Sequence, residues 1–247
     1  MANTHSVDFE SGSSQFASRA DNASMSITGD MTDELWLKFE SLPADGALMV
    51  WTAKWLSAGD ERAYQFGLFN DAGTYKIQAQ ISGDTAGSDT VRYTWAVSTG
   101  VWYHVAITVD VSAAVASQFE FFINAASQGN GDVIADGGFT AIADSTAAFV
   151  VGASQDGTAN FFDGLINSKR VWADIRSGAE ISANYQTSTP AGDNLRFSGF
   201  YNNDSDDDSG NGNDLTTSGS PVYVTDIPYV ESQGGLPSSK LLTGVGK

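Results

Sequence analysis

Hydrophobic and polar residues alternate with a period of two through much of the chain. In residues 34–40, Leu35, Leu37 and Phe39 fall on one face of an extended segment. This alternation is typical of half-buried β-strands. Comparable segments lie at 63–68, 75–81, 91–97, 102–111, 119–123, 149–152 and 162–172. Turn-forming pairs such as Asn130-Gly131 and Asp156-Gly157 separate several of them. Many short strands with almost no helix between them predict a β-sandwich or barrel.

One short helix is predicted near 177–186. Ser177 and Glu180 have the spacing of a capping box, in which each residue caps the backbone of the other. Ile181 and Tyr185 follow four residues apart and would share one helix face. Pro190 closes the region. We expect this helix to cover an edge or an end of the sandwich.

The C-terminal part of the chain changes in composition. Residues 202–214 are polar and acidic and predict a loop. A last strand pair is expected around Leu215 and Val222. Residues 231–247 are rich in Gly and Ser, which predicts a flexible tail beyond a single domain at 1–230.

The charge and the absence of cysteine exclude several classes of partner and of chemistry. The 247 residues include 30 acidic and 12 basic ones, for a net charge of -18, and no cysteine. Nucleic acids and anionic membranes require clustered Lys and Arg, so we expect neither as a partner. Disulfides, cysteine–zinc sites and thiol catalysis are excluded. The acidity favours calcium or a basic partner. The N-terminus has no apolar signal segment, and no apolar stretch is long enough to span a bilayer.

Several segments together resemble the laminin-G-like members of the concanavalin A-like lectin/glucanase superfamily, a type common in bacterial surface and phage virion proteins. Six segments carry the resemblance: SVDFESGSSQF at 6–16, MTDELWLKF at 31–39, WYHVA at 102–106, FDGLINSKRVW at 162–172, EISANY at 180–185 and DSGNGND at 208–214. Their order and spacing match the family over about residues 5–230. Ala125 stands where the family hairpin has Gly. The resemblance implies an all-β jelly-roll β-sandwich of two antiparallel sheets.

Catalysis is not expected. The glucanase relatives place their catalytic carboxylates on one strand as E-x-D-x-E or E-x-D-x-x-E, which alternation brings to one face. The sequence contains no such string. Asp8 and Glu10 have the i, i+2 spacing but lack a third member, and Asp33 and Glu34 are adjacent. His104 is interpreted as a structural histidine, because His5 is the only other histidine.

Calcium is the best chemical hypothesis for a cofactor, because it takes carboxylate, amide and carbonyl oxygens. The resemblance implies a structural site where the opening turn meets the later FDG strand, and it points to Glu10, Asp163 and Asn167. Asn167 replaces the family's Asp and would lower the affinity. A second candidate is the Asp-x-Asp-x-Asp run of Asp204, Asp206 and Asp208. For that run a solvated acidic loop is the competing interpretation.

A carbohydrate site would need exposed aromatic rings beside polar side chains. The candidates are Trp51, Trp55 and Trp95, and Trp55 is expected to be the most exposed because it borders a polar loop. Core packing is the alternative for each ring.

Three functions stay open at this stage. The first is a non-catalytic virion structural protein, a capsid decoration or tail-associated protein, that contacts other virion proteins or copies of itself, with adhesion to host glycans as an additional role. The second is a stand-alone calcium-dependent carbohydrate-binding adhesin. The third, which the missing carboxylate string disfavours, is a glycoside hydrolase or lyase. The expected location is a virion surface or the extracellular space.

Overall fold

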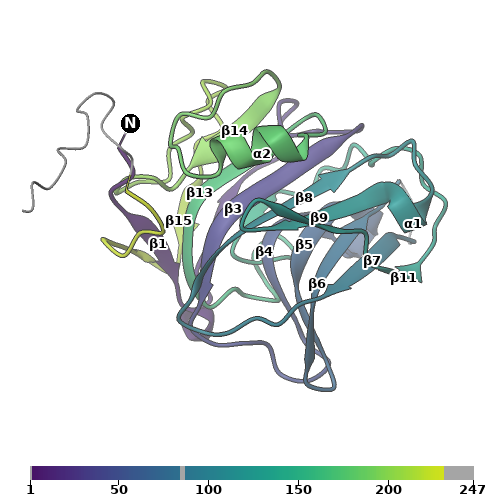
Figure 1. Cartoon of the computed structure of the whole chain (residues 1–247), viewed down its shortest axis with the longest axis horizontal. Helices are drawn as coiled ribbons and strands as arrows, with labels where there is room; N and C mark the ends of the chain where they lie inside the picture. The colour runs from purple at the N-terminus through teal and green to yellow at the C-terminus, as the bar shows by residue number, and fades with distance from the viewer. Residues whose placement is uncertain (1, 84–86, 231–247) are drawn as a thin grey trace, which may run out of the picture.

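A computed structural model describes residues 2–83 and 87–230 as two antiparallel sheets packed face to face (Figure 1). The first sheet has seven strands side by side and an eighth, β14 (Leu195–Gly199), which pairs with β13. The seven are, in spatial order, β10 (Ala126–Gly129), β9 (Phe119–Ile123), β8 (Trp102–Val109), β3 (Met31–Phe39), β13 (Gly164–Trp172), β1 (Ser6–Phe9) and β16 (Val222–Val224).

The second sheet also has eight strands. In spatial order they are β11 (Asp132–Ala135), β7 (Asp89–Thr94), β6 (Thr74–Ile81), β5 (Glu61–Asp71), β4 (Leu48–Leu56), β12 (Phe149–Val151), β2 (Phe16–Arg19) and β15 (Thr216–Ser218). The predicted jelly-roll sandwich is therefore confirmed. The last two strands do not pair with each other: β15 adds to β2 and β16 adds to β1, in opposite sheets.

The core lies between the sheets and contains the residues that the alternation placed on one face. Leu35, Leu37 and Phe39 of β3 meet Phe66 and Leu68 of β5 in one hydrophobic cluster. All five side chains are fully buried. At about 1.5–3 kcal/mol for each large apolar side chain removed from water, this cluster is the main source of the sandwich's stability.

The predicted helix is present as α2 (Gly178–Asn184) and has the expected capping box. The Ser177 hydroxyl accepts from the Glu180 amide, and the Glu180 carboxylate accepts from the Ser177 amide at 2.9 Å. The helix lies over the outer face of the first sheet (Figure 1), where Ile181 packs on Ala106 and Phe122. The other helical segments are α1 (Val115–Gln118) and short 3-10 turns at Ser11–Ser13 and Ala58–Asp60.

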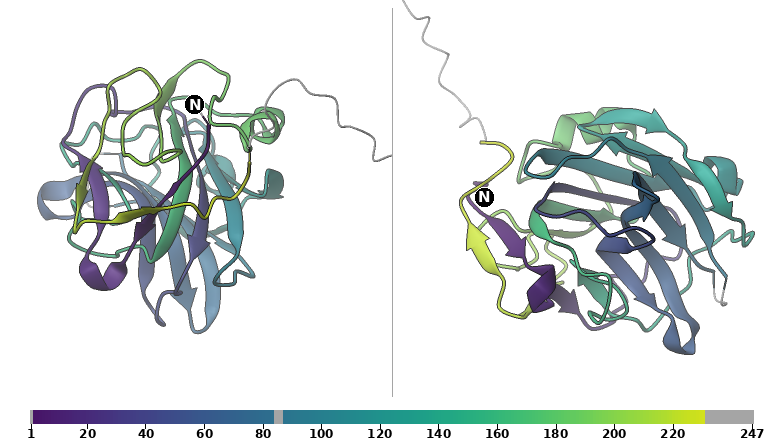
Figure 2. Two further views of the ribbon diagram at one scale, coloured as in Figure 1. Left: turned by 90° about the vertical axis from the view of Figure 1, so that its left-hand side faces the viewer. Right: turned by 90° about the horizontal axis from the view of Figure 1, so that it is seen from below.

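The N-terminal segment and the end of the described chain lie side by side at one end of the sandwich (Figure 2). The Asn3 side chain donates to the Tyr229 carbonyl at 3.3 Å. The predicted tail at 231–247 lies outside the described residues. Among the helices that the structure describes, none is long and apolar enough to cross a membrane.

Candidate metal centre and ligand-binding face

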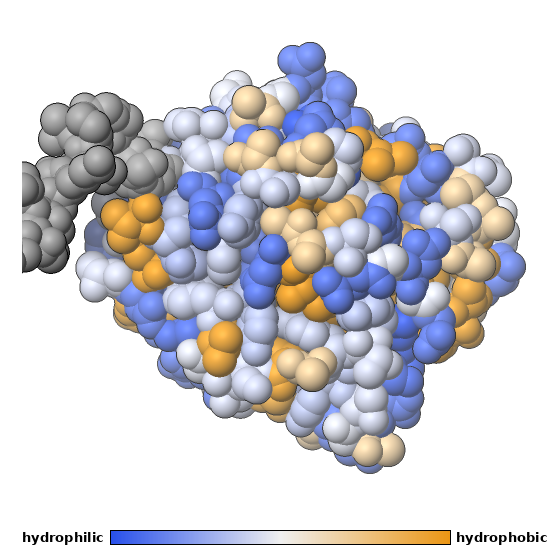
Figure 3. Space-filling model, in the orientation of Figure 1, coloured by the Kyte–Doolittle hydropathy of each residue, from blue (hydrophilic) through white to orange (hydrophobic). Residues whose placement is uncertain are grey.

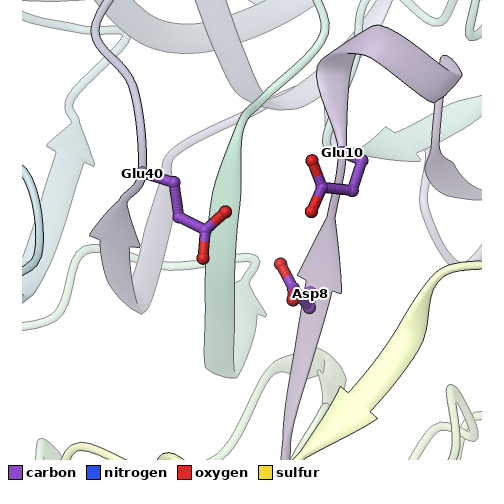
Figure 4. A group of neighbouring side chains, drawn as sticks. All are labelled: Asp8, Glu10 and Glu40. Atoms are coloured by element: carbon purple, nitrogen blue, oxygen red, sulfur yellow. The ribbon is translucent and has the colours of Figure 1, made fainter.

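Three carboxylates converge at one end of the first sheet. Asp8, Glu10 and Glu40 each place an oxygen within 4.8 Å of the other two (Figure 4). Val7 and Phe9 of β1 are buried in the core, so alternation turns Asp8 and Glu10 to the outside. Glu40 follows directly on β3. Residues about thirty positions apart in the chain thus share one site.

A glycine allows this convergence. Gly164 begins β13 with φ +133°, and a Cβ on it would lie 2.2 Å from the Lys38 carbonyl oxygen. Because Gly164 has no side chain, β13 can approach the end of β3, and the Glu40 amide donates to the Asp163 carbonyl at 3.0 Å. The glycine of the FDG segment therefore positions Glu40 beside β1 and β13.

Asp163 joins the surrounding loops. Its Oδ1 accepts from the Ser11 amide at 2.9 Å, and its Oδ2 accepts from the Ser41 hydroxyl at 2.5 Å. Burial opposes the charge of this carboxylate, but the bonds from Ser41 and Ser11 outweigh it and lower its pKa. Asp163 is thus an ionised carboxylate that holds the turn after β1 to the segment after β3.

The neighbouring acids repel one another. Burial, followed by the charges of Glu10 and Asp163, raises the pKa of Asp8. Burial and then the charges of Asp8 and Glu10 raise the pKa of Glu40. Lys38 opposes both shifts, but it also pairs with Asp226. Oxygen donors of like charge held this close fit a hard divalent cation, which would remove the repulsion.

The predicted calcium ligands are brought together only in part. Glu10 and Asp163 lie at this end of the sheet, but Asn167 lies farther along β13 with its side chain fully buried. Its Nδ2 donates to Asn3 Oδ1 at 2.8 Å and to the His5 carbonyl at 2.7 Å. Asn167 therefore fastens the N-terminal segment. Local spacing links Asp8 to Glu10 but does not point to Glu40, because Glu40 follows a different strand and only strand order brings it to the site.

The second predicted acidic run does not form such a group. Among the residues that the structure describes, Asp204, Asp206 and Asp208 are not part of a set of three converging ligands. The side chain of Asp207, between them, accepts from the amides of Ser198 at 3.1 Å and Asn213 at 2.9 Å. Backbone amides thus fold the loop around Asp207, as in a solvated acidic loop.

The predicted sugar-stacking tryptophans are buried. Trp51 is fully enclosed in the main core, and Trp95 packs edge-on against Tyr103 with ring centroids 4.9 Å apart. The expected exposure of Trp55 is wrong: only 5% of it is exposed, because it packs with Val50 and Ala53 and lies under Arg62. None of these rings can stack on a sugar in this conformation.

The outer face of the first sheet is closed by α2 and contains paired charges. Glu34 Oε1 accepts from Arg170 Nη1 and from Trp172 Nε1, both at 3.1 Å. His104 Nε2 lies 3.4 Å from Glu34 Oε2. Burial opposes the Glu34 charge, but Arg170 and His104 outweigh it and lower its pKa to about 2. Burial is the largest effect on His104 and lowers its pKa, although Glu34 opposes this shift. This cluster fastens the helix to the sheet.

The outer face of the second sheet carries neutral amides instead. Gln65, Gln80 and Thr90 are opposite one another on β5, β6 and β7. Gln65 and Gln78 both donate to Gln80 Oε1, at 2.6 and 2.8 Å, and Gln80 donates to Thr90 Oγ1 at 3.0 Å. Neither α1 nor α2 packs extensively on β4, β5 or β6. The amides are therefore held in fixed positions: Gln65, Gln78 and Thr90 are buried, whereas Gln80 is partly exposed.

Arg92 extends this row of amides. Its Nε donates to Gln78 Oε1 at 2.7 Å, and its guanidinium lies 3.5 Å above the centre of the Phe69 ring. Next to Gln78 across the strands is Gly67, where a Cβ would lie 2.3 Å from the Met49 carbonyl oxygen. The position therefore stays without a side chain. We call Phe69, Gln78, Gln80, Thr90 and Arg92 the amide face.

Comparison with known proteins identifies the family. A laminin-G family model described as "Concanavalin A-like lectin/glucanases superfamily" matches residues 11–182. This chain belongs to that superfamily. No curated protein matches the sequence.

Solved structures agree with the lectin-like fold. A candidate carbohydrate-binding protein from Bacteroides ovatus ATCC 8483 superposes with a TM-score of 0.64 at 16% identity, over 91% of this chain and 60% of that one. The chain thus spans about three fifths of that protein's length. The native heptameric SAP-like pentraxin of Limulus polyphemus superposes with a TM-score of 0.54 at 12% identity, over 90% and 94% of the two chains. At these identities the likeness shows the fold alone.

The amide face of this domain has no motif in the sequence. Its glutamines occupy the polar positions of alternating strands, and such positions usually face solvent without further role. The one available signal was repetition, because Gln65 lies on β5 and Gln78 and Gln80 alternate on the next strand, β6. Strand register was needed to bring them into one row.

Proposed function

We propose that this chain is a non-catalytic, lectin-like module that binds carbohydrate on the amide face of its second sheet. The observation that carries the proposal is the row from Gln80 through Gln78 to Arg92, fixed by its own hydrogen bonds. Amide and guanidinium groups donate to and accept from sugar hydroxyls in the plane of each group. The Phe69 ring adds an apolar surface for the C–H face of a sugar ring.

Pre-organisation is the physical reason to prefer this face. Side chains that are already ordered lose little further entropy when a ligand binds. Gln78 is almost fully buried and holds Gln80 and Arg92 in place, and the partly exposed Gln80 and Arg92 are the groups that a ligand would reach. The Arg92 guanidinium uses only Nε in this row, which leaves its terminal N–H groups for a ligand. The net charge of -18 repels acidic glycans, so neutral sugars are the expected ligand class.

Calcium is a second part of the proposal. Asp8, Glu10 and Glu40 would hold one ion, and Asp163 would keep the loops around it in place. The ion would supply positive charge between like-charged carboxylates. It would join the segment after β1 to the segment after β3, so its role is to stabilise the first sheet. The amide face belongs to the other sheet.

A glycan array tests the carbohydrate proposal. The described fold should bind neutral glycans, and Arg92→Ala should lose at least about tenfold in affinity, since hydrogen bonds to a charged group contribute roughly 1.5–3 kcal/mol. The matched control is Arg196→Ala, which removes the same charge from β14 of the first sheet and should bind as the parent does. The same glycans, incubated with the protein, should show no release of reducing ends. Hydrolysis would contradict the non-catalytic assignment.

A role on a virion surface is a narrower form of this proposal. Apolar residues are scattered in small patches over the face in Figure 3, which does not favour one broad assembly interface there. The observation that favours assembly is the edge strand β11, where Val133 and Ile134 are 42% and 48% exposed. Exposed aliphatic residues on an unpaired edge can pair with a second copy. Sedimentation velocity of the parent and of Ile134→Lys tests this: concentration-dependent association lost in the variant supports it, and a monomer throughout contradicts it.

A further inference from the structure

A lysine and an aspartate meet inside the sandwich, away from both candidate sites. Lys169 of β13 and Asp33 of β3 are in direct Nζ to Oδ1 contact, and both side chains are fully buried. They lie on neighbouring strands whose register shifts between Asn167 and Arg170. Ser168, with φ 50°, occupies that irregularity. The shift lets Ile166 and Val171 both enter the core while Lys169 also points inward.

The surroundings oppose the charges of both groups. Burial is the largest effect on each, and it lowers the pKa of Lys169 and raises that of Asp33. Thr52 Oγ1 donates to Asp33 Oδ2 at 3.3 Å. The Tyr64 hydroxyl, also fully buried, has no hydrogen-bond partner among the described residues. Proton transfer from the ammonium to the carboxylate would leave two neutral groups, which a fully buried site tolerates better than two ions.

We propose that Lys169 and Asp33 condense to an intramolecular amide that covalently joins β13 to β3. In the neutral pair, the Nζ lone pair attacks Cγ of the protonated Asp33 carboxyl group. The Nζ–Cγ bond forms, the Cγ–OH bond breaks, and the hydroxyl leaves as water with one proton from Nζ. No oxidant or co-reactant is consumed. Thr52 can polarise the oxygen that stays in the amide.

Proximity makes this step feasible without an enzyme. Two groups held in contact by a folded core react as if at a very high concentration, on the order of 10⁵ M or more for well-oriented pairs. Because the core excludes bulk water, hydrolysis of the product would be slow. The link would close a loop between positions 136 apart in sequence, and the two strands could then not separate fully when the chain unfolds.

A second buried lysine gives an internal control. Lys54 Nζ lies 2.7 Å from Asp21 Oδ1, and it also donates to the carbonyls of Ser145 and Ala147. These three acceptors use all three ammonium donors. The Asp21 side chain is also partly exposed to water. Lys54 and Asp21 should therefore remain an ion pair, so Lys54 can be replaced without affecting the amide.

The test is the intact mass of the denatured full chain. We expect the parent protein to be lighter than its sequence mass by one water molecule, and a tryptic digest to contain a branched peptide that joins the segments of Asp33 and Lys169. Lys169→Arg should have its full sequence mass. Lys54→Arg should still lack one water.

Two results would overturn the proposal. One is a parent protein at its full sequence mass. The other is a water loss that persists in Lys169→Arg, which would place the dehydration elsewhere, for example at an Asp–Gly step such as Asp163–Gly164. If Lys169→Arg does not fold, the mass of the parent and its branched peptide still decide the question.

Discussion

The two sheets differ in the polar side chains on their outer faces. On the first sheet, Glu34 and Arg170 are ionised and are buried under α2. On the second sheet, Gln78 and Gln80 are neutral, and neither of the described α-helices packs extensively on their strand. Buried charges must keep their partners, so they fix one packing arrangement. Neutral amides can exchange a partner at little cost, so they suit a surface that binds and releases a ligand. This difference is the basis of our proposal that the first face serves packing and the second serves recognition.

The largest expected change is a loss of stability when a charged pair on the outer face of the first sheet, under α2, is broken. Glu34→Ala should lower the free energy of unfolding by about 3–5 kcal/mol, because it leaves Arg170 buried without its carboxylate. Gln65→Ala on the outer face of the second sheet should cost less than about 1.5 kcal/mol, because it removes one hydrogen bond between neutral groups and Gln80 Oε1 keeps its bond from Gln78. Urea unfolding of both variants measures this difference. Equal losses would contradict the division between the faces.

Calcium should produce the next largest effect. At a free concentration one hundred times the dissociation constant, a single site would raise the free energy of unfolding by about 2.7 kcal/mol. Thermal unfolding in calcium and in EGTA measures the shift. Asp8→Asn should reduce it, whereas Asp206→Asn should not, because Asp206 lies in the loop folded around Asp207. A calcium effect lost with Asp206 and kept with Asp8 would move the site to that loop.

Acid should destabilise the covered face through Glu34. Its pKa is about 2 in the folded protein and 4.5 ordinarily, so its contribution is complete above pH 4.5 and is lost as the pH falls through 2. Glu34→Gln should therefore flatten the dependence of unfolding free energy on pH between these values. An unchanged slope in circular-dichroism melts would show that the Glu34–Arg170 pair does not control acid stability.

The smallest expected change is in the stability of Asp8→Asn when EGTA has removed calcium. Folding raises the pKa of Asp8 from its ordinary value of 3.8. At a pH above 3.8, the ionised carboxylate therefore lowers the stability of the folded protein. In EGTA at pH 7, Asp8→Asn should raise stability by a few tenths of a kcal/mol, as expected for partly exposed like charges. Below pH 3.8 the gain should disappear, because Asp8 itself is then protonated. A loss of stability at pH 7 would contradict the inference that the ionised Asp8 carboxylate is unfavourable in the folded protein.

Local alternation predicted most strands but not the sites. Leu35, Leu37 and Phe39 were enough to place β3, and Ser177 with Glu180 placed α2. The pairing of β4 with β5 has two register shifts, and Trp51 and Trp55 are buried in different clusters. The polar loop that follows Trp55 in the sequence therefore did not indicate that its ring is exposed. The site residues come together through strand order, which a single sequence does not reveal.

The two sites show the same limit in different ways. Glu40 joins Asp8 only because β13 lies between their strands and begins with a glycine. Gln78 and Arg92 form one row only through the pairing of β6 with β7. Composition predicted calcium as a chemical class, but only the fold suggests which carboxylates would hold it.

The most direct test of the carbohydrate proposal is an NMR titration of the labelled protein with the neutral oligosaccharide that binds best on the array. We predict saturable shifts of the side-chain amide signals of Gln78 and Gln80 and of the Arg92 guanidinium, with the indole signals of the buried tryptophans unchanged. Binding without shifts on β5, β6 and β7, or no binding to any neutral glycan, would contradict the assignment of recognition to the second sheet.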